Sequence, residues 1–272
     1  MMHLPHGIHH GVPDAVYHAK HEGLVSKSAL DLIEQSPAHY RAWLDGAKEE
    51  ESDALAFGQD LHCAVLETER FHAEYIVEPE FGDCRFKANK EARDAWRARN
   101  EGKRLISAVD FEDCLGMARS IKAHMMAGAI LSEGFAEVAL RWQHSEIAMQ
   151  CKGKADWWNP AKRIAADLKS TLNAKKWSFA KSIEKYRYHV QNALYEDAFR
   201  MLGEPIKYFV FIACEKKPPY AVACYLLDEE DIQAGAKAAL DNMETLAKCM
   251  ETGRWPAYGD GVEIIKLPRR GF

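Results

Sequence analysis

The sequence predicts an α+β fold, in which a central mixed β-sheet is flanked by helices. Helical periodicity dominates the chain up to about residue 130. From Phe135 the pattern changes to three successive strands, followed by a helix, two strands and a closing helix. The 272 residues, 47% hydrophobic and 28% charged, can bury a large core, and no repeat or break in composition marks a linker. We therefore expect one elaborated domain at 26–272, with a helical part (26–130) and a sheet core (131–256).

The first 25 residues are expected to form an N-terminal arm. They hold six histidines and lack periodicity: His3, His6, His9, His10, His18 and His21. A histidine-rich stretch can bind a metal, but without an apolar pattern a mobile or loosely packed arm is the simpler interpretation.

The helical part begins at Ser26. Ser28 is a plausible N-cap for a helix over 29–34, and Pro37 opens a second turn that leads to Trp43. A longer helix is expected over 54–69, with an apolar stripe at Leu55, Leu61, Val65 and Leu66. Gly58 and His62, four residues apart, share a neighbouring face of this helix.

Residues 82–104 are basic and polar, with seven cations on a helix and its flanks: Lys87, Lys90, Arg93, Arg97, Arg99, Lys103 and Arg104. Two interpretations stay open, a phosphate-binding segment and a solvated insertion. A further helix is expected over 108–130. In the sheet core, the sequence pattern predicts strands over 135–143, 146–157 and 163–169, a helix over 183–202, strands over 206–214 and 220–227, and a helix over 229–250.

A predicted hairpin brings two acids and a lysine together. If 160–163 form a four-residue loop, Asn159 faces Ile164, and the same register places Asp156 across from Asp167. Facing residues have Cβ atoms roughly 4.5 to 5.5 Å apart, close enough for both carboxylates to hold one cation. Because side chains alternate along a strand, Lys169 shares the face of Asp167 while Leu168 points into the core.

This arrangement suits phosphodiester hydrolysis with a bound Mg²⁺ or Mn²⁺. Asp156 and Asp167 would be metal ligands, and the Leu168 carbonyl a third oxygen. Lys169 would stabilise the attacking hydroxide and neutralise the phosphate. Glu137, on the preceding strand, is a further candidate acid. A surface ion pair on a hairpin would use the same residues, and His62 alone is more typical of a core or boundary histidine.

The charge pattern favours local rather than global attraction for nucleic acid. The net charge is −5, yet residues 151–187 contain ten Lys or Arg and three acids, a local excess of +7. On the following helix, Gln191 and Tyr195 share a face with Arg187 and Tyr188, a combination suited to phosphates and bases. A solvated face and a polar helix rim are the alternatives.

Seven cysteines without C-x-x-C spacing argue against disulfides, a zinc ribbon and an iron–sulfur cluster. No run of about 18 apolar residues and no signal-peptide pattern is present. We expect reduced thiols, no membrane association and a cytoplasmic protein.

Four ordered motifs resemble those of the RecE (exonuclease VIII) type nucleases of the PD-(D/E)XK superfamily, relatives of the RecB nuclease domain and lambda exonuclease. They are Gly58-x-x-x-His62, Lys152-Gly-Lys-Ala-Asp156, Asp167-Leu-Lys169-Ser-Thr171 and Tyr186-Arg-Tyr-His189-Val-Gln191-Asn-Ala-Leu-Tyr195. Similar Ser26-Lys-Ser28, Ser36-Pro37 and Trp255-Pro256 patterns extend the resemblance over about 25–256. Ala155 replaces the superfamily's proline, and Asp167 stands where many members have Glu.

The resemblance implies a Mg²⁺-dependent exonuclease that degrades linear double-stranded DNA from the 5′ end and leaves a 3′ strand for a RecT-like annealing protein. It also implies a homo-oligomeric ring for some members. His62 would be a metal ligand beside Asp156 and Asp167, and Lys169 the catalytic lysine. We expect the DNA contacts to come from nine residues: Gln191, Tyr195, Arg187, Tyr188, Lys152, Lys154, Thr171, Lys175 and Lys176.

Two other functions stay open. A catalytically silent DNA-binding or assembly subunit could keep the fold, although such a subunit has no use for a charged cluster whose repulsion requires a cation. A nuclease of the same fold could instead cut single strands or internal bonds, because polarity and end requirement depend on the shape of the DNA channel.

Overall fold

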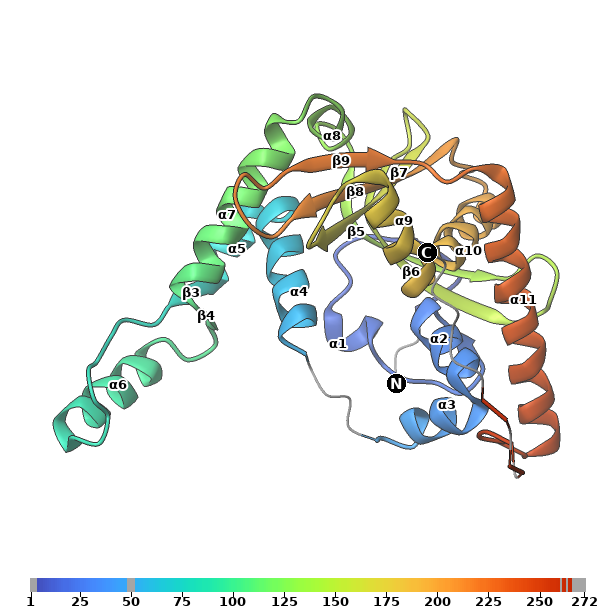
Figure 1. The fold of residues 1–272 in the computed structure, drawn as a ribbon, viewed down its shortest axis with the longest axis horizontal. Helices are drawn as coiled ribbons and strands as arrows, with labels where there is room; N and C mark the ends of the chain where they lie inside the picture. The colour runs from blue at the N-terminus through green and yellow to red at the C-terminus, as the bar shows by residue number, and fades with distance from the viewer. Residues whose placement is uncertain (1–3, 48–51, 260, 263, 266–272) are drawn as a thin grey trace.

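The computed structural model describes residues 4–47, 52–259, 261, 262, 264 and 265. Figure 1 shows a mixed sheet flanked by helices, with a thin arm that projects away from the body. The strands are β1 (Gly7–His9), β2 (Leu24–Val25), β3 (Tyr75–Val77), β4 (Arg104–Ile106), β5 (Phe135–Gln143), β6 (Gln150–Asn159), β7 (Ile164–Thr171), β8 (Tyr208–Glu215) and β9 (Val222–Tyr225). The α+β class and the central mixed sheet are confirmed.

The described helices account for most of the remaining chain. They are α1 (Asp14–Tyr17), α2 (Lys27–Gln35), α3 (Pro37–Leu44), α4 (Asp53–Leu66), α5 (Thr68–Glu74), α6 (Lys87–Arg99), α7 (Ala108–Ala123), α8 (Met125–Ile130), α9 (Lys176–Lys185), α10 (Tyr188–Met201) and α11 (Glu229–Thr252). No helix in the described ranges combines the length and the apolar character that a bilayer span requires.

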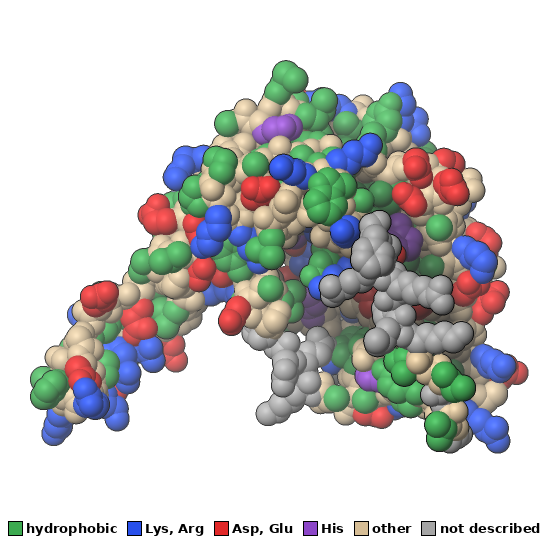
Figure 2. Space-filling view, in the orientation of Figure 1, with side chains coloured by type: hydrophobic (Ala, Val, Ile, Leu, Met, Phe, Trp, Pro, Cys, Tyr) green, Lys and Arg blue, Asp and Glu red, His purple; other side chains and the backbone are tan. Residues whose placement is uncertain are grey.

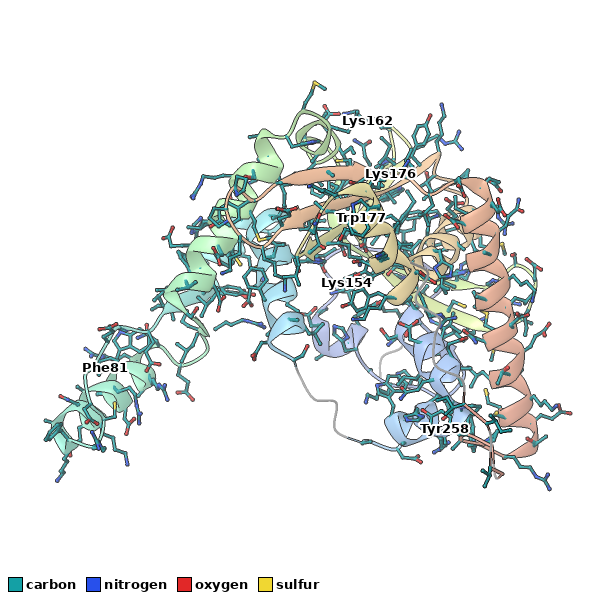
Figure 3. The ribbon with its side chains drawn as sticks, viewed as in Figure 1. Phe81, Lys154, Lys162, Lys176, Trp177 and Tyr258 are labelled. Atoms are coloured by element: carbon teal, nitrogen blue, oxygen red, sulfur yellow. The ribbon has the colours of Figure 1, made fainter. Side chains whose placement is uncertain are left out.

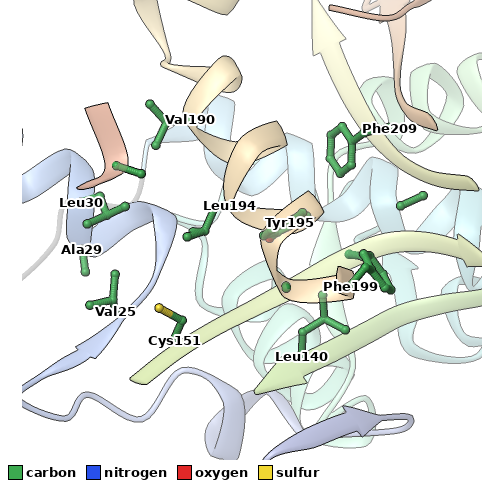
Figure 4. Packing of buried hydrophobic residues seen from close by; sticks show 14 of the residues in the cluster. Val25, Ala29, Leu30, Leu140, Cys151, Val190, Leu194, Tyr195, Phe199 and Phe209 are labelled. Carbon is green, nitrogen blue, oxygen red and sulfur yellow. The ribbon is translucent and has the colours of Figure 1, made fainter. Parts of the chain in front are cut away.

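The main sheet has the order β1-β5-β6-β7-β8-β9, and β2 pairs with β6 beside this path. The β7–β8 and β2–β6 pairs are parallel, and the other pairs are antiparallel. Helices α10 and α11 pack on one face with a large core cluster, of which Figure 4 shows Leu140, Leu194 and Phe209. Helices α4 and α7 pack on the other face, against Leu168 and Ile212. The sheet is therefore covered on both sides, as its apolar strands require.

The N-terminal residues differ from the expected loose arm. Gly7–His9 add an edge strand to β5, and Leu24–Val25 pair with β6. Leu24 and Val25 are buried. Strands of two or three residues are too short to show an alternating apolar pattern in the sequence. Their stability comes from the sheet that they join.

Helix boundaries differ from the sequence expectation at three places. Ser26, rather than Ser28, caps α2, since its hydroxyl accepts from the amide of Ala29 at 3.2 Å. The helix expected over 108–130 is interrupted at His124, whose ring caps α8. The helix expected over 183–202 covers only the end of α9 and the whole of α10; the two are separated at Arg187, where the backbone takes a left-handed φ of 53°, and the start of α9 was not expected.

The arm carries the basic segment of the sequence. It consists of α6 beyond the two-stranded parallel sheet β3–β4. Helix α6 has no buried residue, and acids pair with most of its arginines, Arg93 with Asp94 and Arg97 with Glu78. Figure 2 shows basic and acidic side chains interspersed along it. The solvated-insertion interpretation accounts for these contacts, and a DNA contact stays a prediction.

Candidate active site

The hairpin register predicted from the sequence is confirmed. Asn159 pairs with Ile164 and Trp157 with Ala166, so the positions of Asp156 and Asp167 lie side by side on β6 and β7. On the other neighbour of β6, the pairs Ala136–Trp157 and Val138–Ala155 place Glu137 opposite Asp156. Three carboxylates therefore follow one another across three adjacent strands.

Strands β6 and β7 separate beyond the three residue pairs next to the turn. There the Asp156 side chain takes the place of a backbone carbonyl of β6, because its Oδ2 accepts the hydrogen bond of the Leu168 amide at 2.7 Å. Ala155 and Trp158, three residues apart, both face the α10 side, so the regular alternation of β6 shifts beside Asp156. Glu137, across from it, has a left-handed φ of 51°. Backbone distortion of this kind is frequent where side chains converge for function.

We call the place where β6 and β7 separate the β6–β7 fork. Helix α4 contributes His62 to this fork. Ser52 caps the helix, and the buried Leu61 and Val65 fix it on the sheet. The His62 ring hydrogen-bonds through Nε2 to the Leu168 carbonyl at 2.9 Å, and its Nδ1 lies 3.6 Å from Asp156 Oδ2 and 4.0 Å from Glu137 Oε1. Since a carbonyl only accepts, Nε2 donates this hydrogen bond, and Nδ1 faces the two carboxylates.

The three side chains His62, Glu137 and Asp156 form a candidate metal centre, with one ligand atom from each lying within 4.8 Å of the others. Burial, followed by the neighbouring Asp167, raises the pKa of Asp156, so its charged form needs a positive partner. An imidazole and carboxylate oxygens suit a divalent cation. The residues therefore fit the metal that the PD-(D/E)XK motif implies.

This group shares His62 and Asp156 with the predicted metal ligands, but it contains Glu137 in place of Asp167. Asp167 is buried and turned the other way: its Oδ1 accepts from the Gln191 amide and its Oδ2 lies 2.5 Å from Lys169 Nζ. The Leu168 carbonyl lies at the fork and has His62 as its partner. Glu137, expected only as an additional acid, completes the compact group. The liganding role of each residue stays a prediction.

Lys169 lies beside the acids, on the face that alternation predicts. Burial alone lowers the pKa of its amine, but the charges of Asp167 and Asp156 outweigh burial and raise that pKa. The amine is therefore a cation at neutral pH. The Tyr188 ring lies 4.5 Å from Nζ and limits its movement.

Helix α10 braces β6 and β7, two of the three strands that carry the acids. Gln191 holds Asp167, while the buried Tyr195 hydroxyl donates to the Lys154 carbonyl at 3.0 Å and accepts from the Lys154 amide at 3.2 Å. A Cβ at position 153 would lie 2.7 Å from the Tyr195 ring, so only glycine allows this approach. The Gln191 and Tyr195 pair of the sequence motif thus has a clear positioning function, and DNA contact by these residues stays a prediction.

Three predicted DNA contacts are engaged inside the protein. Arg187 donates to the Leu30 carbonyl and to Asp31 and Asn242. The Lys152 amine donates to the carbonyls of Tyr17 and Ala19, and Lys154 pairs with Glu137 and Asp14. By contrast, Lys175 and Lys176 are exposed at the start of α9, and Thr171 ends β7.

Sequence reasoning missed the N-terminal residues that border the site. Asp14 pairs with Lys154 at 2.9 Å, and the Tyr17 ring lies 4.9 Å from the same amine. Burial, followed by Glu137 and Asp156, raises the pKa of Tyr17. These contacts join positions about 140 residues apart, and no local pattern in the sequence indicates them.

Comparison with known proteins is consistent with this geometry. No curated protein matches the chain. Among solved structures, it is similar to one described as "Putative exonuclease" from Eubacterium rectale, with 14% identity over 95% of this chain and 96% of that chain and a TM-score of 0.64. It is also similar to a phage related exonuclease from Haemophilus somnus 129PT, with 12% identity over 64% of this chain and 92% of that chain, but a TM-score of 0.32 carries no structural argument.

At these identities the Eubacterium rectale structure supports the fold alone. The family evidence is stronger, because the family model of the PDDEXK-like domain of unknown function (DUF3799) matches residues 26–268, nearly the whole chain. The chain therefore belongs to this PDDEXK-like family.

Proposed function

We propose that the protein is a metal-dependent deoxyribonuclease that hydrolyses phosphodiester bonds of linear double-stranded DNA. The observation that carries the proposal is the convergence of His62, Glu137 and Asp156 at the β6–β7 fork, with the Lys169 ammonium beside it. A divalent cation such as Mg²⁺, or Mn²⁺ in its place, would lower the pKa of a bound water, so that hydroxide is available near neutral pH, and would offset the charge of the phosphate.

The residues of the chain supply the remaining requirements. His62, Glu137 and Asp156 would hold the cation. Lys169, a cation held by Asp167, would orient the attacking hydroxide and neutralise charge on the phosphate as it develops. Gln191 fixes the Asp167 carboxylate and so fixes the lysine. This preorganisation is favourable because the groups need no rearrangement during the reaction.

The finer features of the proposal are supported by the motif resemblance. They comprise digestion from the 5′ end, a 3′ single-stranded product, action in the cytoplasm beside a RecT-like annealing protein in recombination, and assembly into a ring.

The test is digestion of linear duplex labelled at either its 5′ or its 3′ ends and of closed circular duplex, with and without Mg²⁺. We expect loss of linear DNA that requires Mg²⁺ and begins at the 5′ label, while circles stay intact. Cut circles would indicate an endonuclease, and binding without cleavage would indicate a silent subunit.

Two variants assign the activity to the site. Asp167→Ala and Lys169→Ala are expected to abolish Mg²⁺-dependent digestion, because Lys169→Ala removes the cation that neutralises the phosphate and Asp167→Ala removes the carboxylate that holds this cation in place. Lys237→Ala is the matched control, since Lys237 is exposed on α11 and pairs with the exposed Asp241. Undiminished digestion by either site variant would refute the assignment.

A further inference from the structure

A groove adjoins the catalytic lysine between the start of α4, the end of β7 and helix α9, and its volume is about 780 Å³. We call it the α9 groove. Ser170 and Thr171, which follow Lys169 on β7, line it. Tyr188 also lines it, and the Tyr188 ring lies 4.5 Å from Lys169 Nζ. The groove therefore leads directly to the proposed reaction centre.

Helix α9 presents a regular polar stripe to this groove. Ser178, Lys181, Ser182 and Lys185 all line it. Their spacing of i, i+3, i+4 and i+7 places them on one face of a helix, so hydroxyls and ammonium groups alternate along the wall. The buried Phe179 anchors the helix. Glu184, the acid of α9, lines a different cavity on the far side.

The lining residues include three lysines and no acid. Within the described chain, none of these lysines forms an ion pair with a carboxylate. Their neighbours are aromatic rings instead: Lys181 lies 4.5 Å from Trp177, Lys185 lies 5.1 Å from Tyr186, and Lys216 lies 4.9 Å from Phe57. The charge of the groove is thus available to an anion, in contrast to the arm, where Arg85 and Arg97 have acidic partners.

Large apolar side chains are exposed around the same lysines. Leu55, Leu172 and Tyr186 line the groove with exposed fractions of 54%, 88% and 48%, and Trp177 on α9 is 63% exposed. Figure 3 shows Trp177 beside Lys176 on this helix. Single exposed apolar residues are ordinary, but four around one cationic groove need an explanation. Unpaired bases provide one, because they stack on apolar and aromatic side chains while lysines bind the phosphates.

We propose that the α9 groove binds a single-stranded segment of DNA that runs to or from Lys169. The proposal rests on the proposed nuclease function and adds to it the path of one strand. Lys181, Lys185 and Lys216 contact phosphates, and Trp177, Tyr186 and Leu172 contact bases. A duplex would use the lysines alone, since its bases are already stacked inside the helix.

The test is equilibrium binding of a fluorescein-labelled oligo(dT) and of a duplex of equal length, measured by anisotropy in EDTA so that no cleavage occurs. For the Lys181→Gln/Lys185→Gln double variant we expect about tenfold weaker binding of the single strand. Its slope of log affinity against log salt is expected to fall by about 1.4, the value for two lost contacts to single-strand phosphates. Trp177→Ala is expected to weaken the single strand about tenfold and the duplex less than twofold.

The matched control is Lys237→Gln/Lys248→Gln on helix α11, whose two lysines are exposed and do not line the α9 groove, and it is expected to change single-strand affinity less than twofold. Equal losses for both DNAs with Trp177→Ala, an unchanged affinity in the Lys181/Lys185 variant, or a control loss as large as that of the groove variant would each overturn the proposal. Groove-dependent single-strand binding by a protein that digests no DNA would uphold the groove and refute the nuclease. Normal digestion by the wild-type protein, together with unchanged single-strand binding by the groove variants, would uphold the nuclease and refute the groove.

Discussion

His62, Asp156 and Gln191 each fix part of the site through a hydrogen bond to the backbone or to a neighbouring side chain. His62 fixes its Nε2 on the Leu168 carbonyl and directs Nδ1 toward two acids, while Asp156 binds the Leu168 amide. Gln191 reaches Asp167 from the face of the sheet on which α10 packs. Each hydrogen bond to the backbone or to a neighbour determines where the remaining polar atom points, and this is how a buried site is preorganised.

Gly153 allows β6 to approach the Tyr195 ring closely beside the site. Gly153→Ala would place its Cβ 2.7 Å from the Tyr195 ring. We expect a loss of about 1–3 kcal/mol in the free energy of unfolding, measured by urea denaturation, because the ring and β6 must move apart. Gly58→Ala on α4 is the control: no atom lies within 4 Å of the added Cβ, and alanine should stabilise the helix by about 0.5–1 kcal/mol. A neutral Gly153→Ala would show that α10 does not brace β6 in this way.

Lys152 gives the fold a pH dependence. Burial, followed by the charge of Arg141, lowers the pKa of its amine from 10.5 to about 8. Between pH 8 and 10.5 the unfolded chain therefore binds more protons than the folded chain at this position, so stability from Lys152 rises with pH. The gain is at most about 3 kcal/mol.

The check is urea denaturation of wild type and Lys152→Met at pH 7.5, 9 and 10. The difference in unfolding free energy between them should shift in favour of wild type as pH rises, since the variant lacks the titrating amine. A difference independent of pH would contradict the depressed pKa.

The sequence indicated much of the site at this scale. Asp156, Asp167 and Lys169 belong to one hairpin, so a local register was sufficient to bring them together. Glu137 could be named but not placed, because its position depends on a left-handed backbone conformation that a strand pattern does not indicate. Asp14 and Tyr17 reach the site across the fold and could not be predicted at all.

At the scale of elements, strand patterns were more informative than helix lengths. Strands β5, β7 and β8 lie close to their expected bounds, because buried strands are rich in apolar residues between clear turns. The α9–α10 break was missed since Tyr186 and Arg187 are compatible with a helix, and only tertiary contacts of Arg187 explain its left-handed backbone.

The arm is an element that the body does not need for stability. We expect that replacing residues 82–102 by a short Gly/Ser linker changes the free energy of unfolding by less than about 1 kcal/mol, because α6 buries no residue and its ion pairs are exposed. Phe71→Ala, which empties a fully buried position in α5, should cost about 3–5 kcal/mol in the same urea experiment. A loss from the linker variant as large as this would show that the arm is part of the core.

At the scale of the whole molecule, the site is the place where three parts of the chain meet. Helix α4 brings His62, the sheet brings the acids and Lys169, and the N-terminal segment closes one side through Asp14 and Tyr17. The α9 groove leaves on another side. This division explains why family motifs are spread from residue 58 to residue 195 and still describe one centre.

The most direct measurement is Mn²⁺ binding by calorimetry without DNA, for wild type, Glu137→Gln, Asp156→Asn and the exposed control Glu133→Gln. Wild type and Glu133→Gln should bind Mn²⁺ alike, while Glu137→Gln and Asp156→Asn should bind at least about tenfold more weakly, because each loses a charged oxygen ligand. Wild-type affinity in Glu137→Gln, or the absence of Mn²⁺ binding by the wild-type protein, would contradict a metal centre formed by His62, Glu137 and Asp156.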